Sequence, residues 1–244
     1  KLESMKLCKS KEWLPEEKFF NGDDPPQLTN DQNKIISKII EHKNFNAWLI
    51  HGITGSGKTE IYLRLIQHFF KTKQQALILV PEINLTPQLE IRFRQRFNKK
   101  KVVILHSFIS DRDRLMHWQQ AKSGEADIII GTRLAVFTPM KKLGLIIIDE
   151  EHDSSFKQQE GLKYHARDVA LVRAKELNIP VIMGSATPSL ESWLNTKPEI
   201  KKFNYFKINN RAVLGSKLPN IKLIPYEKNI SNSLSKQIIS SIQD

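Results

Sequence analysis

The fold is decided by residues 47–59, which read AWLIHGITGSGKT. The last eight residues match the pattern G-x-x-x-x-G-K-[ST], in which glycines let the backbone wrap closely around phosphate groups. An apolar run leads into this loop, and a helical pattern with apolar residues at Ile61, Leu65, Ile66 and Phe69 leads out of it. The free N–H groups at the start of that helix point at bound phosphates. The stretch therefore predicts a strand, a phosphate-binding loop and a helix.

Each part of the loop has an expected task. Lys58 is predicted to reach the β- and γ-phosphates of a nucleotide, and the hydroxyl of Thr59 is predicted to ligate Mg²⁺. The remaining predicted nucleotide-binding residues of the loop are Gly52, Thr54, Gly55, Ser56 and Gly57. An ordinary glycine-rich turn before a helix is the alternative, and the full match in the right context disfavours it.

Short apolar runs alternate with helical patterns from Leu28 to about Thr196. This alternation is typical of βαβ units and a parallel sheet. Because most of the runs are continuously apolar, we expect helices to cover both faces of the sheet. The fold class is α/β, with a mostly parallel sheet of about six or seven strands flanked by helices. The strands are predicted at Ala47–Ile50, Ala76–Val80, Val102–Leu105, Asp127–Ile130, Leu145–Ile148 and Val181–Met183.

Composition limits the function classes. The 244 residues carry a net charge of +12, which suggests a polyanionic partner. No apolar run approaches the ~20 residues that a bilayer span needs, so no membrane association is expected. Cys8 is the single cysteine, which excludes an internal disulfide framework or a Cys-rich zinc site and fits a reducing, cytoplasmic setting. Residues 1–27 are predicted to be an irregular leader, 28–200 the globular lobe and 201–244 an extension.

A second motif follows the apolar run at 145–148 and reads Asp149-Glu150-Glu151-His152. A strand of a parallel sheet delivers such carboxylates to its carboxyl end, where ligands bind in open α/β sheets. Asp149 is predicted to hold Mg²⁺, and Glu150 to orient and deprotonate an attacking water. Alone, an acidic cluster after a strand is usually a solvated loop, but the phosphate loop upstream reverses that interpretation. Lys58, Asp149 and Glu150 are thus the predicted catalytic residues.

A third motif, at residues 184–188, reads GSATP and follows another apolar strand. Its hydroxyl residues, Ser185 and Thr187, could sense the γ-phosphate through Asp149 or His152. A plain turn closed by the final proline is the alternative, and it is favoured when the segment is considered alone.

Taken together, these segments resemble motifs I, II and III of superfamily-2 helicases. Three segments narrow the resemblance to the primosomal replication-restart DNA helicases: LVPEINLTPQ at 79–88, IGTR at 130–133 and DEEHDSSFKQQEGLKYHARD at 149–168. The resemblance covers about residues 28 to 225. It implies that residues 28–200 are the first RecA-like lobe of a P-loop NTPase motor that acts as an ATP-dependent 3′-to-5′ DNA helicase.

The same resemblance implies cofactors and partners. ATP and Mg²⁺ would bind this lobe, and zinc is expected only in a second-lobe region outside these residues. The partners would be single-stranded and forked DNA, other primosome proteins and single-stranded DNA-binding protein. Residues 1–27 would be the end of an upstream DNA-binding region, and 201–244 would lead towards the second lobe.

Further residues gain predicted roles from the resemblance. Gln32 stands where the family recognises adenine, although Thr29 and Gln32 also have the spacing of a helix capping box. Thr86 and Arg133 lie in segments that resemble those touching the DNA backbone. The prolines around Thr86 could equally just shape a loop, and Arg133 could be an ordinary surface charge.

The polar loop at 153–168 resembles the aromatic-rich loop that couples DNA binding to ATP turnover in the family. Aromatic rings interleaved with cations suit single-stranded DNA, because bases stack on rings while cations meet phosphates. The alternative is a surface loop whose rings are tucked into the core. Leu162 stands where some relatives carry a tryptophan. The predicted DNA-binding residues here are Phe156, Lys157, Tyr164, His165 and Arg167.

Two other functions remain open. One is a different superfamily-2 translocase or an RNA helicase, although the latter would more often show Asp-Glu-Ala-Asp at 149–152. The other is a module that binds ATP and DNA without hydrolysis. The presence of Lys58, Thr59, Asp149 and Glu150 argues against that second alternative.

Overall fold

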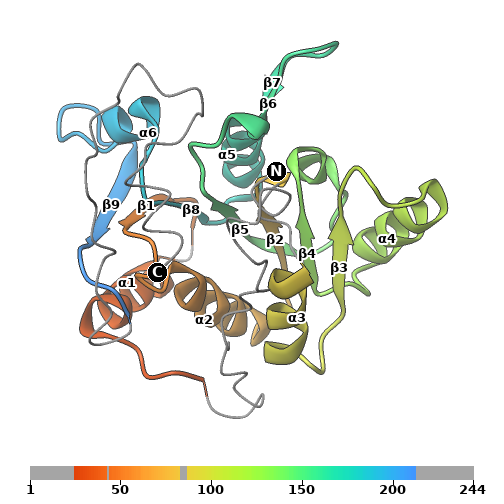
Figure 1. Cartoon of the computed structure of the whole chain (residues 1–244), viewed down its shortest axis with the longest axis horizontal. Coiled ribbons are helices and arrows are strands. Elements are labelled where there is room, and N and C mark those ends of the chain that lie inside the picture. The colour runs from red at the N-terminus through yellow and green to blue at the C-terminus, as the bar shows by residue number, and fades with distance from the viewer. Residues whose placement is uncertain (1–24, 43, 83–86, 213–244) are drawn as a thin grey trace, which may run out of the picture. The chain divides into compact units, whose positions relative to one another are not determined.

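The computed structural model describes residues 25–42, 44–82 and 87–212. They form a seven-stranded sheet in the order β3-β4-β2-β5-β8-β1-β9, in which every neighbouring pair is parallel (Figure 1). This confirms the predicted α/β class. The strands are β1 (Ala47–Gly52), β2 (Gln75–Leu79), β3 (Val102–Leu105), β4 (Ile128–Gly131), β5 (Leu143–Asp149), β8 (Val181–Ser185) and β9 (Phe203–Ile208).

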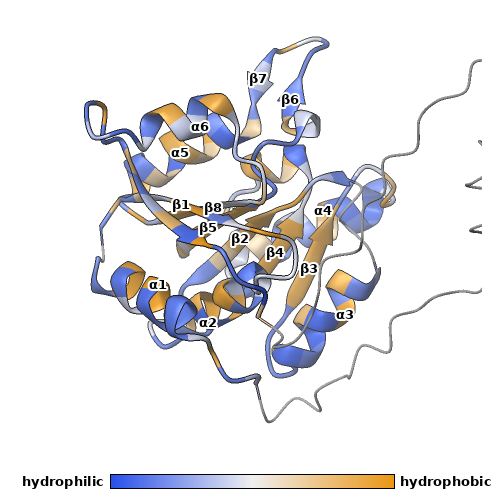
Figure 2. Ribbon diagram, turned by 60° about the vertical axis from the view of Figure 1, so that its left-hand side comes forward, coloured by the Kyte–Doolittle hydropathy of each residue, from blue (hydrophilic) through white to orange (hydrophobic). Residues whose placement is uncertain are grey.

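Helices cover both faces of the sheet, as Figure 2 shows. On one face lie α1 (Asn30–Glu41), α2 (Lys58–Phe70) and α3 (Pro87–Arg96). On the other lie α4 (Asp111–Ser123), α5 (Ala166–Leu177) and the 3₁₀ turn η2 (Arg133–Phe137). A short helix, α6 (Leu190–Asn195), follows β8. No helix in the described ranges is long and apolar enough to cross a membrane.

The strands are apolar on both sides because each side packs against a helical layer. In β1, Trp48 and Ile50 belong to the core cluster beneath α1 and α2, whereas Ala47 and Leu49 belong to the cluster beneath α5. This alternation follows from the two-residue period of a strand. It explains why the buried strands appear in the sequence as unbroken apolar runs.

The strand β9 was missed by the sequence analysis, and the predicted lobe boundary at residue 200 falls before it. The strand pairs in parallel with β1 from Phe203 to Ile208 and forms one edge of the sheet. An edge strand has one neighbour and keeps part of its surface in solvent, so polar residues such as Asn204 and Lys207 are tolerated. Because of these polar residues, the segment lacks the continuous apolar run by which the other strands were predicted.

A small antiparallel hairpin projects beside α5 (Figure 1). It pairs β6 (Lys157–Gln158) with β7 (Tyr164–His165) and follows a 3₁₀ turn, η3 (Ser154–Phe156). This hairpin contains most of the predicted aromatic-rich loop.

The strand order has one consequence for function. Strands β5, β8 and β1 are neighbours, and the three sequence motifs follow their carboxyl ends. Because parallel strands end at the same edge of a sheet, residues more than a hundred positions apart in the chain meet there.

Candidate active site

The phosphate loop joins β1 to α2 in a conformation that glycine makes possible. Gly55 and Gly57 have φ angles of 78° and 81°, in the left-handed region that favours glycine. Gly57 is also the N-cap of α2, and no side chain caps that helix end. The first N–H groups of α2 are therefore available to an anion at the positive end of the helix dipole.

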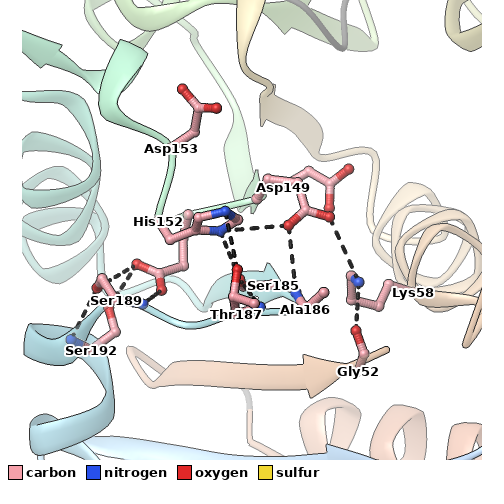
Figure 3. Close-up of polar contacts among 12 residues, drawn as sticks. Gly52, Lys58, Asp149, His152, Asp153, Ser185, Ala186, Thr187, Ser189 and Ser192 are labelled. Carbon is pink, nitrogen blue, oxygen red and sulfur yellow. Dashed lines mark hydrogen bonds and ion pairs between the residues drawn. The ribbon is translucent and has the colours of Figure 1, made fainter. Parts of the chain in front are cut away.

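Lys58 is buried at the start of α2 and is held from two sides. Its Nζ donates to the carbonyl of Gly52 at 2.8 Å (Figure 3). The same Nζ lies 3.7 Å from Oε1 of Glu150. The predicted phosphate-binding lysine and the predicted water-activating carboxylate thus face each other across the site. A phosphate entering between them would exchange an internal ion pair for a contact with Lys58.

Asp149, the last residue of β5, has a partner that sequence analysis missed. Its Oδ1 accepts a hydrogen bond of 3.0 Å from the hydroxyl of Tyr62. Burial raises the pKa of Asp149, and the neighbouring charge of Glu150 raises it further. Burial, with the nearby Asp149, also raises the pKa of Tyr62 well above its usual value, so the phenol remains a donor. Nothing in the local sequence distinguishes Tyr62 from an ordinary core aromatic on α2.

The second and third motifs meet through His152. Its Nδ1 lies 2.8 Å from Oγ of Ser185, and its Nε2 lies 3.3 Å from Oγ1 of Thr187 (Figure 3). The same Nδ1 is 3.6 Å from Oε2 of Glu150, which also accepts a bond of 3.5 Å from the N–H of Ala186. The three residues that were predicted to couple the motifs are therefore brought together.

Glu151 is fully buried and is surrounded by donors. Its carboxylate accepts from the N–H of Ser189 at 2.8 Å, from the hydroxyls of Ser189 and Ser192 at 3.1 and 2.8 Å, and from Arg167 Nη1 at 3.1 Å. Buried charges of this kind are paired and hydrogen-bonded, because an isolated charge in the interior is costly. Glu151 had no predicted role, and in the structure it joins the second motif to α5 and α6.

Arg167 differs from its prediction as a DNA contact. Its guanidinium is buried, forms the ion pair with Glu151 and donates to Ser189 and Ser192. Those contacts hold α5 against the second motif and α6 and turn the charge away from solvent. In this structure Arg167 is part of the framework of the site.

Three of the other predicted DNA-binding residues, Thr86, Phe156 and Arg133, lie outside the strands of the hairpin. Thr86 lies outside the described residues. Phe156 is 0% exposed and packs in the core beneath α5, so no base can stack on its ring as it lies. Arg133 Nη1 donates to the carbonyls of Ser155 and Lys157 at 3.0 and 3.3 Å and thereby anchors the hairpin.

The side chains of the hairpin differ in their exposure to solvent. Lys157 is exposed, whereas Tyr164 is half-buried, with its ring 5.0 Å from that of Phe137 in an edge-to-face contact. Burial, followed by the charge of Arg167, lowers the pKa of His165, which therefore carries less positive charge near neutral pH. Lys157 and the neighbouring exposed Lys163 are the cations of the hairpin that face solvent.

Gln32 forms the capping box with Thr29 and also contacts the phosphate loop. The Thr29 hydroxyl accepts from the Gln32 N–H at 3.3 Å, and Gln32 Oε1 accepts from the Thr29 N–H at 2.9 Å. The amide Nε2 of Gln32 then donates to the carbonyl of Ser56 at 3.1 Å. Gln32 therefore braces the loop, and recognition of adenine by this residue stays a prediction.

The segment after β9 also touches the phosphate loop. The N–H of Ala212 donates to the carbonyl of Gly55 at 2.9 Å. The side chain of Arg211 lies beside Gly55, 3.7 Å from the position that a Cβ on that glycine would take. This segment lies beyond the predicted lobe boundary at residue 200, and no local sequence pattern indicates the contact.

The residues present fit a nucleotide with its Mg²⁺. The loop offers free helix N–H groups, and the buried Oγ of Ser56 has no hydrogen-bond partner among the described residues. Thr59 and Asp149 supply oxygen ligands of the kind that Mg²⁺ prefers. The described part of the chain contains no group of three or more metal-binding side chains. Mg²⁺ commonly binds through one or two side chains together with substrate phosphates and water.

Three curated relatives share the name "Replication restart protein PriA". The protein from Haemophilus influenzae is 46% identical over 225 residues, which cover 92% of this chain and 30% of the relative. The Bacillus subtilis protein is 37% identical over 222 residues, covering 89% and 27%. The Synechocystis protein is 50% identical over 175 residues, covering 71% and 21%. This chain thus spans less than a third of the length of these relatives.

Solved structures share the fold. RecG bound to a three-way DNA junction has a TM-score of 0.57 and 23% identity, covering 80% of this chain and 25% of that chain. The UvsW helicase from bacteriophage T4 has a TM-score of 0.54 and 17% identity, covering 77% and 62%. A model of the DEAD/DEAH box helicases matches residues 29–195, which include the phosphate loop, the acidic motif and the third motif. The chain belongs to the DEAD/DEAH box helicase family.

Proposed function

We propose that this chain is the ATP-binding lobe of a replication-restart DNA helicase that moves 3′ to 5′ and hydrolyses ATP. The observation that carries the proposal is the meeting of Lys58, Glu150 and His152 at one edge of the sheet. Similarity to three proteins named for replication restart supports DNA as the nucleic acid. Forked DNA, primosome proteins and single-stranded DNA-binding protein are the partners that we propose for the whole protein.

The residues divide the work of phosphoryl transfer. The phosphate loop binds the phosphates through backbone N–H groups, and Lys58 neutralises charge on the β- and γ-phosphates. Thr59 and Asp149 would hold Mg²⁺, which neutralises charge that develops on the phosphate oxygens. Glu150 orients a water for attack and accepts its proton. The Glu150 carboxylate lies close enough to Lys58 and His152 to be placed by both.

The same contacts offer a route from the nucleotide to the third motif. Glu150 touches the N–H of Ala186, and His152 touches Ser185 and Thr187. A change at Glu150 when the γ-phosphate leaves would alter both contacts. We propose that this cluster transmits the state of the nucleotide to the rest of the protein.

We expect single-stranded DNA to stimulate ATP turnover by the intact protein, and single-stranded RNA of the same length to stimulate it much less. The measurement is phosphate release with DNA, with RNA and without nucleic acid. Equal stimulation by RNA would favour another superfamily-2 translocase. Nucleotide binding without any turnover would identify a non-hydrolysing module.

A second prediction concerns the exposed hairpin cations. Replacing both Lys157 and Lys163 by alanine should weaken binding of single-stranded DNA and flatten its salt dependence. Each lost phosphate contact should lower the slope of log K against log salt by ~0.7. Fluorescence anisotropy at several salt concentrations measures both effects.

The matched control for the hairpin is Lys71→Ala, at the far end of α2, where an exposed lysine lies away from the carboxyl edge of the sheet. This control should leave affinity and slope unchanged. An unaltered slope in the hairpin double variant would show that DNA does not contact these lysines.

A further inference from the structure

Tyr62 occupies an unusual position beside the predicted metal ligand. It lies on α2, four residues after Lys58, and is 1% exposed. Its hydroxyl donates to Oδ1 of Asp149 at 3.0 Å. A buried phenol has few alternative orientations, so this donor holds the carboxylate from a fixed point.

Gly184 creates the space that the hydroxyl fills. A Cβ built on Gly184 would lie 1.6 Å from the Tyr62 hydroxyl oxygen and 2.9 Å from Cζ of the ring. It would also lie 3.5 Å from Cδ of Lys58. Any side chain at position 184 would therefore displace the phenol from the place at which it meets Asp149.

The helical spacing ties this arrangement to the phosphate loop. Residues four apart lie on the same face of a helix, so Lys58 and Tyr62 project together towards the ends of β5 and β8. One face of α2 thus presents a phosphate-binding cation and a donor aimed at the carboxylate. Tyr62 thereby ties the helix that follows the phosphate loop to Asp149.

We propose that Tyr62 is a positioning residue for Mg²⁺–nucleotide binding, and that the lack of a side chain at Gly184 is what allows it to reach Asp149. This inference rests on the proposed function, because it takes Mg²⁺ bound with ATP as the ligand of Asp149. Partners of metal-binding carboxylates orient them, and loss of such a partner typically costs about 10–100-fold in metal affinity or activity.

The test is Tyr62→Phe in the intact protein, which removes the hydroxyl and keeps the ring. Binding of a non-hydrolysable ATP analogue is titrated with Mg²⁺ and also measured in its absence with chelator. We expect the half-saturating Mg²⁺ concentration to rise ~10-fold, while affinity for the analogue without Mg²⁺ stays at the wild-type value. A general loss of packing would instead change both quantities.

The matched control is Tyr205→Phe, which removes a hydroxyl that lies 2.8 Å from Nδ1 of His51. It should leave the Mg²⁺ dependence unchanged. A second variant, Gly184→Ala, retains the phenol but displaces it, so it should also raise the Mg²⁺ requirement. In the Tyr62→Phe background, the same alanine should add little to that requirement, because the ring that it still meets at Cζ has no hydroxyl left to hold Asp149.

Two results would overturn the inference. One is an unchanged Mg²⁺ requirement in folded Tyr62→Phe protein. The other, which decides the matter if that variant folds poorly, is an unchanged requirement in Gly184→Ala. Failure of the wild-type protein to bind the analogue with or without Mg²⁺ would contradict the proposed function itself, and is thereby distinguished from a failure of the Tyr62 proposal.

Discussion

Replacing Lys58 by alanine is expected to abolish ATP turnover in the intact protein while the fold is retained. The ammonium group of Lys58 donates a hydrogen bond to the carbonyl of Gly52 and lies 3.7 Å from Oε1 of Glu150. The proposed function brings the transferred phosphate to this place. Loss of a single donor that stabilises developing charge costs about 10²–10³-fold in rate, and a full positive charge should cost at least as much.

The measurement for Lys58→Ala is phosphate release at saturating DNA, together with the thermal unfolding midpoint. Lys71→Ala, at the residue that follows the other end of α2, is the control for loss of an exposed lysine. Wild-type turnover in the Lys58→Ala protein would show that the phosphate loop has been assigned wrongly.

Replacing Arg167 by methionine is expected to produce the largest loss of stability. The change leaves the fully buried carboxylate of Glu151 without its ion-pair partner. Removing one partner of a buried pair typically costs about 3–5 kcal/mol, because the remaining charge is uncompensated. For a lobe of this size we expect the midpoint of its thermal unfolding transition to fall by roughly 10 °C.

Two further variants make the Arg167 prediction sharp. Adding Glu151→Gln to Arg167→Met removes the stranded charge and should recover part of the lost stability. Arg92→Met, on an exposed face of α3, should change the free energy of unfolding by no more than about 0.5 kcal/mol. If Arg167→Met left the stability unchanged and weakened DNA binding, the original prediction that Arg167 contacts DNA would be supported instead.

The local sequence pattern was sufficient to predict the phosphate loop, the buried strands and the position of Asp149. The loop at 52–59 needs glycine at positions 55 and 57, where φ is positive, and a lysine at the start of the helix. These requirements fall on neighbouring residues, so the local sequence is enough to recognise the loop. The buried strands are recognisable because both of their faces meet helices. The position of Asp149 followed from the rule that parallel strands end at one edge of the sheet.

Pattern failed where a residue's role depends on what packs against it. Phe156 and Arg167 are residue types that are common in DNA-binding loops. In this fold, however, the ring of Phe156 is buried under α5, and the guanidinium of Arg167 is paired with Glu151. Strand β9 was missed because an edge position tolerates polar residues. In each case the local sequence was compatible with two environments, and only the burial of the surrounding elements distinguished them.

The sequence by itself predicted a phosphate-binding loop, and it placed that loop correctly at the end of a buried parallel strand, because such a loop needs residue types in a fixed consecutive order. The tertiary structure alone decided that Tyr62 reaches Asp149 over the bare backbone of Gly184. These residues come from three separate elements, and the local sequence around each of them gives no sign of the other two. Contacts between distant segments depend on strand order and helix packing, which are properties of the whole core.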